Sequence, residues 1–275
     1  MIILKKIINI FINILIFLGI IKKKINSLRV LMFHDISDLD KFEKIILHLK
    51  KEWKFISPDT FTKISKNKKK IKKKLILLTF DDGFKSNILV ANQILSKHKI
   101  KAIFFVPFQF VKLKKTLEKK KFIQKNLKVK NKNNKSYNMN LNDLKSLIKQ
   151  KHQIGAHTYS HKDLKLLKNM KKLKFEIIFS TNKFEAQINR KINLFAFNFG
   201  RLKNISLSMM KLANKRYDFL FTGVRGQNNL NSKIIFRDNI TLEDNLFDIN
   251  AYLNGTYDFI YENERKKILS YLIKC

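Results

Sequence analysis

Short apolar runs alternate with amphipathic segments along nearly the whole chain, and this alternation limits the folds that the sequence can adopt. The runs are apolar at consecutive positions, as expected for parallel strands that other elements cover on both faces. Roughly seven strand–helix units fit the chain, which suits an α/β barrel better than an open sheet of a few strands. Strands are expected at residues 29–33, 75–80, 102–106, 153–156, 194–197, 219–222 and 234–237.

The segments between the runs carry apolar residues at helical spacing and predict helices. Asn140 is a good N-cap for one of them, because its side chain can accept a hydrogen bond from the first turn. Residues 111–140 are rich in Lys and Asn, and we interpret them as an insertion or loop. Helices are expected at residues 42–51, 86–98, 141–151, 168–189, 206–216, 242–252 and 257–274.

Polar side chains stand at the ends of several predicted strands. They are His34, Asp81, Asp82, His157 and Asn198. In an α/β barrel, the carboxyl ends of the strands form the face on which sites are built. These residues are therefore candidates for one functional site.

The chain is strongly basic, with 58 Lys and Arg against 21 Asp and Glu and a formal net charge of +37. Such a balance is common in proteins that bind nucleic acid or anionic surfaces. Most of the basic residues are Lys, however, and Ile, Asn and Phe are also abundant, which indicates a general compositional bias. No zinc-finger spacing, RNA-binding strand signature or Arg-rich recognition helix is present in the sequence. No specific nucleic-acid partner is expected.

Residues 1–24 are expected to form a hydrophobic membrane-anchor or interfacial helix ahead of a single domain at 25–275. The stretch from Ile7 to Ile21 is apolar except for Asn9 and Asn13, and lysines flank it on both sides. As a helix it would span about 22 Å, less than a hydrocarbon core of about 30 Å. A short signal-anchor and a helix in the plane of the membrane surface are equally consistent with this length. A helix packed on the soluble domain fits less well, because almost every position is apolar.

Asp81 and Asp82 are adjacent and are followed by Gly83. Neighbouring residues of an extended chain point to opposite sides, but a glycine allows a sharp turn that brings both carboxylates to one cavity. One carboxylate could then bind a metal while the other handles a proton. An Asp before Gly is also ordinary turn and N-cap chemistry, and the pair alone favours that simpler interpretation.

His157 and His161 shift the balance towards a metal site. On a helical turn, residues four apart share one face, so both imidazoles could reach one ion. The only cysteine is Cys275, so any metal must be held by His and carboxylates. Two His and one carboxylate leave positions open for water and substrate, as a catalytic zinc site requires.

The segments TFDDG (79–83) and HTYSH (157–161) together resemble the polysaccharide deacetylases of the NodB type, over roughly residues 28–240. The resemblance implies a distorted (β/α)7-type barrel and a metal-dependent hydrolase that removes acetyl groups from glycans. It implies that Asp82, His157 and His161 are the metal ligands and that Asp81 is the general base. The metal would be a divalent ion, zinc first, with cobalt, nickel or manganese also suited to this ligand set.

Further segments resemble one branch of that family. LMFHDI (31–36) resembles its N-terminal His-containing segment, which would make His34 the general acid; a structural strand-end histidine is the alternative. FAFNFG (195–200) resembles a FAYPFG-like segment that lines the substrate groove and supplies an oxyanion donor. Phe197 replaces the usual Tyr and Asn198 the usual Pro, and Phe199 follows them. Arg237, in a segment that also resembles that branch, would orient Asp81 or form a plain structural ion pair.

Three functions are consistent with these features. The first is a deacetylase, N-acetyl most expected, that acts on an acetylated polysaccharide or lipid-linked glycan at a membrane surface of a bacterial cell envelope. The second is a catalytically degenerate glycan- or membrane-binding protein on the same fold, motivated by the altered FAFNFG segment. The third is a nucleic-acid binder, motivated by charge alone. The sequence does not fix the side of the membrane.

Overall fold

The computed structural model describes residues 27–67, 71–129 and 137–275. The expected N-terminal hydrophobic helix lies outside these residues. Within them, one nine-stranded sheet has the order β8-β7-β6-β5-β4-β3-β1-β9, and β2 pairs with β3 beside this path. The strands are β1 (Ser27–Phe33), β2 (Lys54–Phe55), β3 (Lys74–Phe80), β4 (Ala102–Val106), β5 (Gln153–Ala156), β6 (Leu194–Ala196), β7 (Phe219–Phe221), β8 (Ile234–Ile235) and β9 (Asp238–Asn239).

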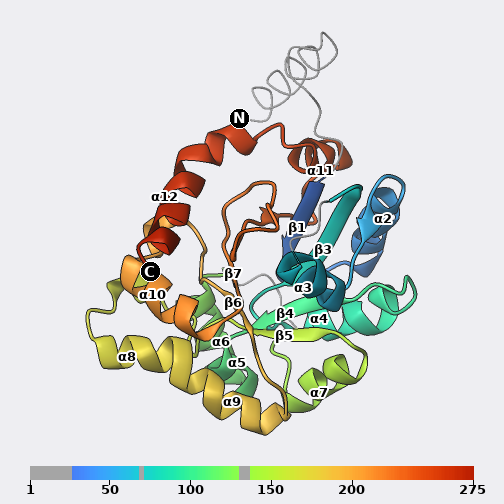
Figure 1. The fold of residues 1–275 in the computed structure, drawn as a ribbon. Helices are drawn as coiled ribbons and strands as arrows, with labels where there is room; N and C mark the ends of the chain where they lie inside the picture. The colour runs from blue at the N-terminus through green and yellow to red at the C-terminus, as the bar shows by residue number, and fades with distance from the viewer. Residues whose placement is uncertain (1–26, 68–70, 130–136) are drawn as a thin grey trace.

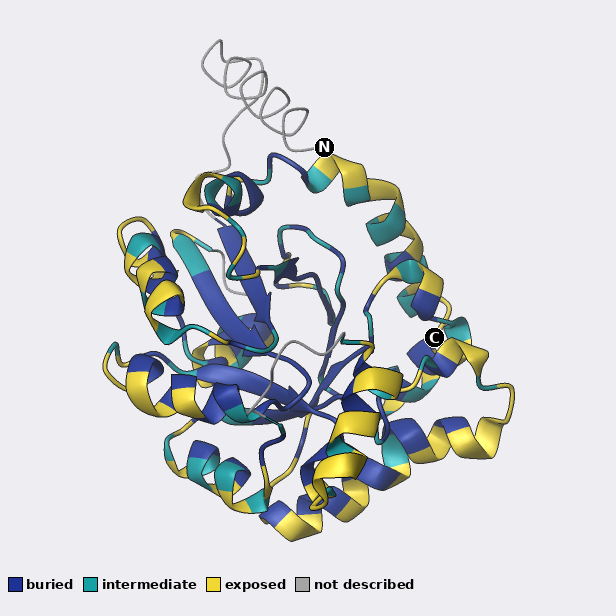
Figure 2. Ribbon diagram, turned by 180° about the vertical axis from the view of Figure 1, so that it is seen from behind, coloured by how far each residue is buried: buried dark blue, intermediate teal, exposed yellow. Residues whose placement is uncertain are grey.

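Helices surround the strands, as Figure 1 shows, and Figure 2 shows their exposed outer faces around the buried sheet. No described helix is long and apolar enough to cross a membrane. The α-helices are α2 (Leu39–Lys50), α3 (Pro58–Lys66), α4 (Lys85–Val90), α5 (Phe108–Lys112), α6 (Thr116–Phe122), α7 (Leu141–Lys149), α8 (Met170–Lys174), α9 (Ser180–Ile188), α10 (Leu207–Arg216), α11 (Leu246–Leu253) and α12 (Glu262–Ile273). Short π-helical segments are η1 (Ala91–Leu95), η2 (Ile123–Leu127) and η4 (Phe175–Phe179), and 3-10 turns are η3 (Leu164–Leu166), η5 (Leu202–Asn204) and η6 (Asp258–Tyr261).

All strand pairs of the sheet are parallel, which confirms the α/β barrel expected from the sequence. The last two strands are separated by only two residues, Phe236 and Arg237. Because β8 pairs with β7 and β9 pairs with β1, this single segment joins the two ends of the described sheet. The arrangement is a distorted half-barrel that the chain itself bridges. The strand predicted at 234–237 is shorter than expected, since β8 ends at Ile235, and β9 at Asp238–Asn239 was not predicted.

The two faces of the sheet bury separate groups of side chains. Residues that alternate along a strand point to opposite faces. In β1, Leu31 and Phe33 pack with the core under the outer helices, while Leu28 and Val30 belong to a second cluster. Phe61 of α3 joins that second cluster and packs on Phe219 and Phe221, with ring centroids 5.1 and 5.9 Å apart.

The Lys- and Asn-rich segment 111–140 is more ordered than the sequence predicted. Between residues 111 and 129 it contains the end of α5, α6 and η2. Its buried side chains Phe122, Ile123 and Leu127 form a cluster with Phe84 and Phe110. Of the two interpretations, insertion or loop, the loop was wrong here, because lysines separate the few apolar residues and hide their helical spacing.

The strand register brings the predicted polar ends to one level. Phe33 of β1 pairs with Phe80 of β3, so His34 and Asp81 follow paired positions. Val106 pairs with Ala156 at the ends of β4 and β5, and His157 comes next. The carboxyl ends of these strands therefore meet at one edge of the sheet.

Candidate metal centre and active site

A cavity of about 360 Å³ lies at the carboxyl ends of the strands. Among the described residues, its polar lining is His34, Asp35, Asp81, Asp82, His157, His161 and Arg237. Apolar walls come from four separate parts of the chain and comprise Met32, Phe84, Leu127, Val129, Phe197 and Phe199. The strand-end residues singled out from the sequence are thus brought together, except that Asn198 lies behind the wall.

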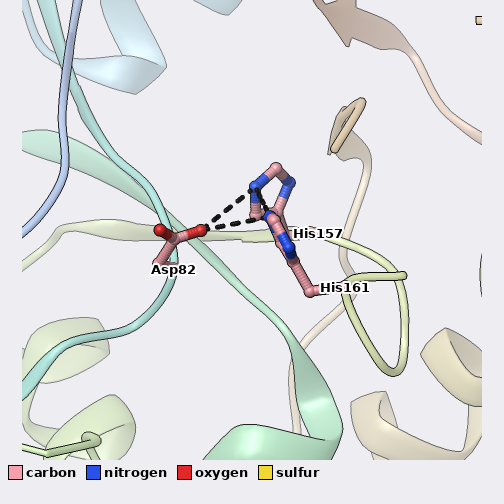
Figure 3. A group of neighbouring side chains, drawn as sticks. All are labelled: Asp82, His157 and His161. Carbon is pink, nitrogen blue, oxygen red and sulfur yellow. Dashed lines mark hydrogen bonds and ion pairs between the residues drawn. The ribbon is translucent and has the colours of Figure 1, made fainter. Parts of the chain in front are cut away.

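Asp82, His157 and His161 converge on one point, as Figure 3 shows. The Nε2 atoms of the two imidazoles are 3.2 Å apart. Oδ1 of Asp82 lies 3.2 Å from Nε2 of His161 and 3.6 Å from Nε2 of His157. Three ligands at about 2.1 Å around a tetrahedral zinc ion would be about 3.4 Å apart. The separations fit a metal ion of this size.

The other ring nitrogens of both histidines are anchored to carbonyl oxygens. Nδ1 of His157 lies 2.8 Å from the carbonyl oxygen of Ala196, and Nδ1 of His161 lies 3.0 Å from that of Asn126. A carbonyl only accepts, so each Nδ1 carries the hydrogen and each neutral ring presents a lone pair at Nε2. This is the arrangement that orients histidine ligands in metal sites.

The site therefore brings together hydrogen-bond acceptors, the two Nε2 atoms and the Asp82 carboxylate, with too few donors to pair them. Oδ1 of Asp82 is buried and has no hydrogen-bond partner of good geometry among the described residues. Burial lowers the pKa of His157 to about 4, so this imidazole is neutral at physiological pH. Burial also opposes a charge on His161, but the Asp82 carboxylate outweighs it and raises the pKa of His161. A proton on His161 partly fills the need for positive charge, and a divalent cation would fill it fully. The donor set fits a metal.

Asp81 has a different partner. Its carboxylate receives two hydrogen bonds from the Arg237 guanidinium, at 2.7 and 2.8 Å, and both side chains are buried. Arg237 is itself fixed by hydrogen bonds to the Thr222 carbonyl and the Thr79 hydroxyl. Burial would raise the pKa of Asp81, but the Arg237 charge outweighs it and holds this pKa below its usual range. Asp81 is therefore an oriented, ionised carboxylate, with Oδ2 3.7 Å from Nε2 of His157.

His34 lies at the wall of the same cavity, directly after β1. It is near enough to both aspartates to be a minor electrostatic cause of their lowered pKa, after Arg237 for Asp81 and His161 for Asp82. Asp35 beside it accepts a hydrogen bond of 2.6 Å from Ser86. The sequence did not single out Asp35, although it follows the same strand.

The segment from Phe197 to Phe199 forms one wall. The Phe197 N–H donates to the Phe221 carbonyl at 3.0 Å, so it is occupied. Phe199 has a left-handed backbone with φ of +57°, and its ring edge packs on His161 with centroids 5.1 Å apart. Within the described part of the chain, the Phe199 N–H has no acceptor. The Asn198 side chain is buried and turns away from the cavity towards Thr158.

His157 and His161 do not lie on a helical turn, and that sequence expectation was wrong. Thr158 and His161 have positive φ angles of +63° and +55°, so the chain forms a tight irregular loop. Thr158 and Ser160 favour such a loop, because their hydroxyls compete for backbone groups. The Thr158 hydroxyl accepts the His161 N–H at 3.0 Å.

Two residues that the sequence did not indicate also hold this loop. Glu176 is buried and accepts the N–H groups of Tyr159 and Ser160 at 3.0 and 2.9 Å, together with the Ser160 hydroxyl at 2.6 Å. Asn126 of η2 donates from its side chain to the Ser160 carbonyl at 2.6 Å. The segment 111–140, interpreted from the sequence as an insertion or loop, thus contributes a residue that supports the candidate metal centre.

The chain matches the family model described as polysaccharide deacetylase over residues 68–217, which is more than half of its length. This range contains the two aspartates, both loop histidines and the segment at 195–200. No curated protein sequence matches the chain.

Solved structures of low identity share the fold. The deacetylase PplD of Streptococcus pyogenes, solved in complex with acetate, is 18% identical with a TM-score of 0.67, over 84% of this chain and 99% of PplD. IcaB of Ammonifex degensii is also 18% identical, with a TM-score of 0.66, over 84% and 96%. A de-N-acetylase of Aggregatibacter actinomycetemcomitans is 14% identical, with a TM-score of 0.65, over 82% and 100%.

Proposed function

The chain belongs to the polysaccharide deacetylase family, and on that premise we propose that it is a metal-dependent hydrolase that removes N-acetyl groups from a glycan. The observation that carries the metal dependence is the convergence of three buried ligand atoms, on Asp82, His157 and His161. The described residues give the carboxylate oxygen no hydrogen bond of good geometry.

Asp82, His157 and His161 would hold the ion, and the two carbonyl-anchored Nδ1–H groups fix the imidazoles for it. A divalent metal at this position supplies Lewis acidity, which lowers the pKa of a water molecule and polarises an acetyl carbonyl. The set of two imidazoles and one carboxylate suits zinc, cobalt, nickel or manganese.

Asp81 is the proposed general base. Its ionised carboxylate borders the metal-binding atoms, and Arg237 keeps it from turning away. It accepts the proton of the attacking water as the carbonyl carbon becomes tetrahedral. The oxyanion then needs a donor, and the Phe199 N–H is the candidate because it is unpaired among the described residues and its ring lines the cavity.

His34 is the proposed general acid. It lines the same cavity as the two aspartates and is less buried than the loop histidines. A proton from its ring would pass to the nitrogen of the leaving sugar amine, and acetate would depart as the other product. Base and acid thus come from two neighbouring strands, β3 and β1.

The substrate class rests on the family and on two solved relatives, one named a de-N-acetylase and one solved with acetate. An acetylated polysaccharide and an acetylated lipid-linked glycan both fit. The apolar stretch at 7–21 supports action at a membrane surface of a bacterial cell envelope.

Metal content and acetate release test the proposal together. The full-length protein is purified, its metals are measured by elemental analysis, and acetate release from N-acetylglucosamine oligomers is followed with and without chelator. About one transition-metal ion per chain, and release that chelator abolishes and metal restores, are expected. Bound metal without release from N-acetylated or O-acetylated glycans would favour a glycan-binding protein. Absence of metal would refute the proposed centre.

A further inference from the structure

The loop that carries both candidate histidine ligands has a backbone that needs outside support. Thr158 and His161 adopt positive φ angles, which residues other than glycine rarely adopt. His161 is itself one of these residues, so the position of its imidazole depends on whatever stabilises the loop. The loop itself contributes the hydrogen bond from the His161 N–H to the Thr158 hydroxyl.

Asn198 forms hydrogen bonds to this loop on both sides of His161. Its Nδ2 group donates to the Thr158 hydroxyl oxygen at 3.0 Å and to the Lys162 carbonyl at 2.9 Å. The Thr158 hydroxyl oxygen therefore receives both the Asn198 amide and the His161 N–H. One buried amide fixes the residues on either side of a candidate metal ligand.

The two neighbours of Asn198 in the sequence form part of the cavity wall. Phe197 and Phe199 flank Asn198 and both line the cavity, and the Phe199 ring packs on the His161 ring. Asn198 therefore links the loop after β6, which carries the proposed oxyanion donor, to the loop after β5, which carries the metal ligands. The FAYPFG-like segment that residues 195–200 resemble has proline at this position, and proline offers no side-chain donor.

The Asn198 side chain is not explained by stability. Its Oδ1 atom is buried and has no hydrogen-bond partner within the described residues. An unsatisfied buried acceptor is unfavourable, and an apolar residue of the same size would avoid it. Because both of its amide hydrogens go to one loop, Asn198 is better explained by what it holds in place.

We propose that Asn198 is a positioning residue that holds the Thr158–Lys162 loop in its metal-binding conformation, in place of the rigidity that proline would give. The inference rests on the proposed metal centre. It predicts that metal affinity and stability respond differently to substitution. Asn198→Leu keeps the branched shape at a somewhat larger volume, removes the amide donor and also removes the unsatisfied acceptor.

The test measures Zn²⁺ affinity of the full chain by competition with a chromophoric chelator, and thermal unfolding of the metal-free protein. For Asn198→Leu we expect Zn²⁺ binding weaker by about tenfold or more, with little loss of melting temperature. Asn198→Ala should show the same loss of affinity if Asn198→Leu does not fold. The double variant with Thr158→Val should lose no more affinity than the larger single loss, because both act on one link.

Asn228→Ala is the matched control. Asn228 is also a buried bridging amide, bonded to Phe236 and Leu28 away from the cavity. It should lower the melting temperature and leave Zn²⁺ affinity unchanged. Wild-type affinity in both Asn198 variants, or a loss that follows melting temperature as in Asn228→Ala, would overturn the role of Asn198. A wild-type chain that binds no Zn²⁺ would instead refute the proposed function.

Discussion

Asp81 and Asp82 are neighbours in the sequence, but their side chains have separate partners. Asp81 pairs with Arg237, and Asp82 faces the two histidines. The separation comes from the backbone, because both Asp82 and Gly83 have positive φ angles, +72° and +73°. A regular strand would have sent the two carboxylates to opposite faces. The turn instead brings both to one cavity with separate partners.

Substitution of the two aspartates should separate metal binding from proton transfer. Asp82→Ala removes a ligand, so we expect both metal binding and acetate release to be lost. Asp81→Asn keeps the shape but cannot accept a proton, so metal content should be retained while kcat falls by about 10²–10⁴-fold. Elemental analysis and acetate release, measured on the same samples, check this. Full turnover by Asp81→Asn would show that another group is the base.

Arg237 should matter for stability as well as orientation. Arg237→Gln leaves the Asp81 carboxylate buried without its cation, and we expect the free energy of unfolding of the metal-free protein to fall by about 3–5 kcal/mol. Urea denaturation measures this change. The double variant Asp81→Asn with Arg237→Gln should recover part of the loss, since the charge is removed with its partner.

Lys266→Gln is the control for Arg237, because Lys266 and Glu262 form an exposed pair on α12. Its cost should be below about 1 kcal/mol. A loss in Arg237→Gln as small as in this control would mean that the buried pair adds little.

At the scale of elements, the sequence predicted most strands well and the site loops poorly. β4 and β5 match their predicted bounds at both ends. β4 is a compact apolar run that Pro107 stops, and β5 is a short segment that His157 ends. The N-cap predicted at Asn140 is also confirmed, and Asp143 extends it to a capping box that was not predicted. Asn126 was not, because its carbonyl holds His161 and any residue could supply that atom. Only the folded structure shows that the Asn126 carbonyl lies beside the His161 ring.

The residue directly before β5 is a histidine that should make stability depend on pH. The Nδ1 atom of His152 accepts the Ala102 N–H at 3.0 Å, and its ring packs on Phe104. Burial lowers the pKa of His152 to about 4 in the folded protein, against about 6.5 when unfolded. The neutral form therefore contributes stability above pH 6.5, and this is lost as pH falls towards 4.

We expect the wild-type protein to lose about 2 kcal/mol between pH 7.5 and 5 through His152 alone. His152→Asn keeps an acceptor for the Ala102 N–H and does not titrate. Between pH 7.5 and 5, the unfolding free energy of this variant should therefore fall by about 2 kcal/mol less than that of the wild type. Urea denaturation of the metal-free proteins at both pH values gives the difference. Parallel pH curves for the two proteins would show that His152 does not titrate on unfolding.

The whole molecule carries a net charge of +37, which repels itself in the compact state. Raising NaCl from about 20 mM to about 300 mM shortens the screening length below about 10 Å and weakens that repulsion. We expect the melting temperature to rise with salt, by about 2–4 °C for each kcal/mol gained. A neutral osmolyte at equal osmolarity is the control. A melting temperature that falls with NaCl would show that attractive pairs outweigh the repulsion.

The segment Ile234–Asn239, which joins the two ends of the sheet, also sets the order in which the site matures during synthesis. Asp81 is translated 156 residues before its partner Arg237. A nascent chain that has emerged only as far as Lys233 contains both aspartates and both loop histidines but no fixed base. Acetate release from chains stalled at increasing lengths should therefore begin only after β9 has left the ribosome. Catalytic activity would then begin only when the barrel closes, so an unfinished chain would be inactive.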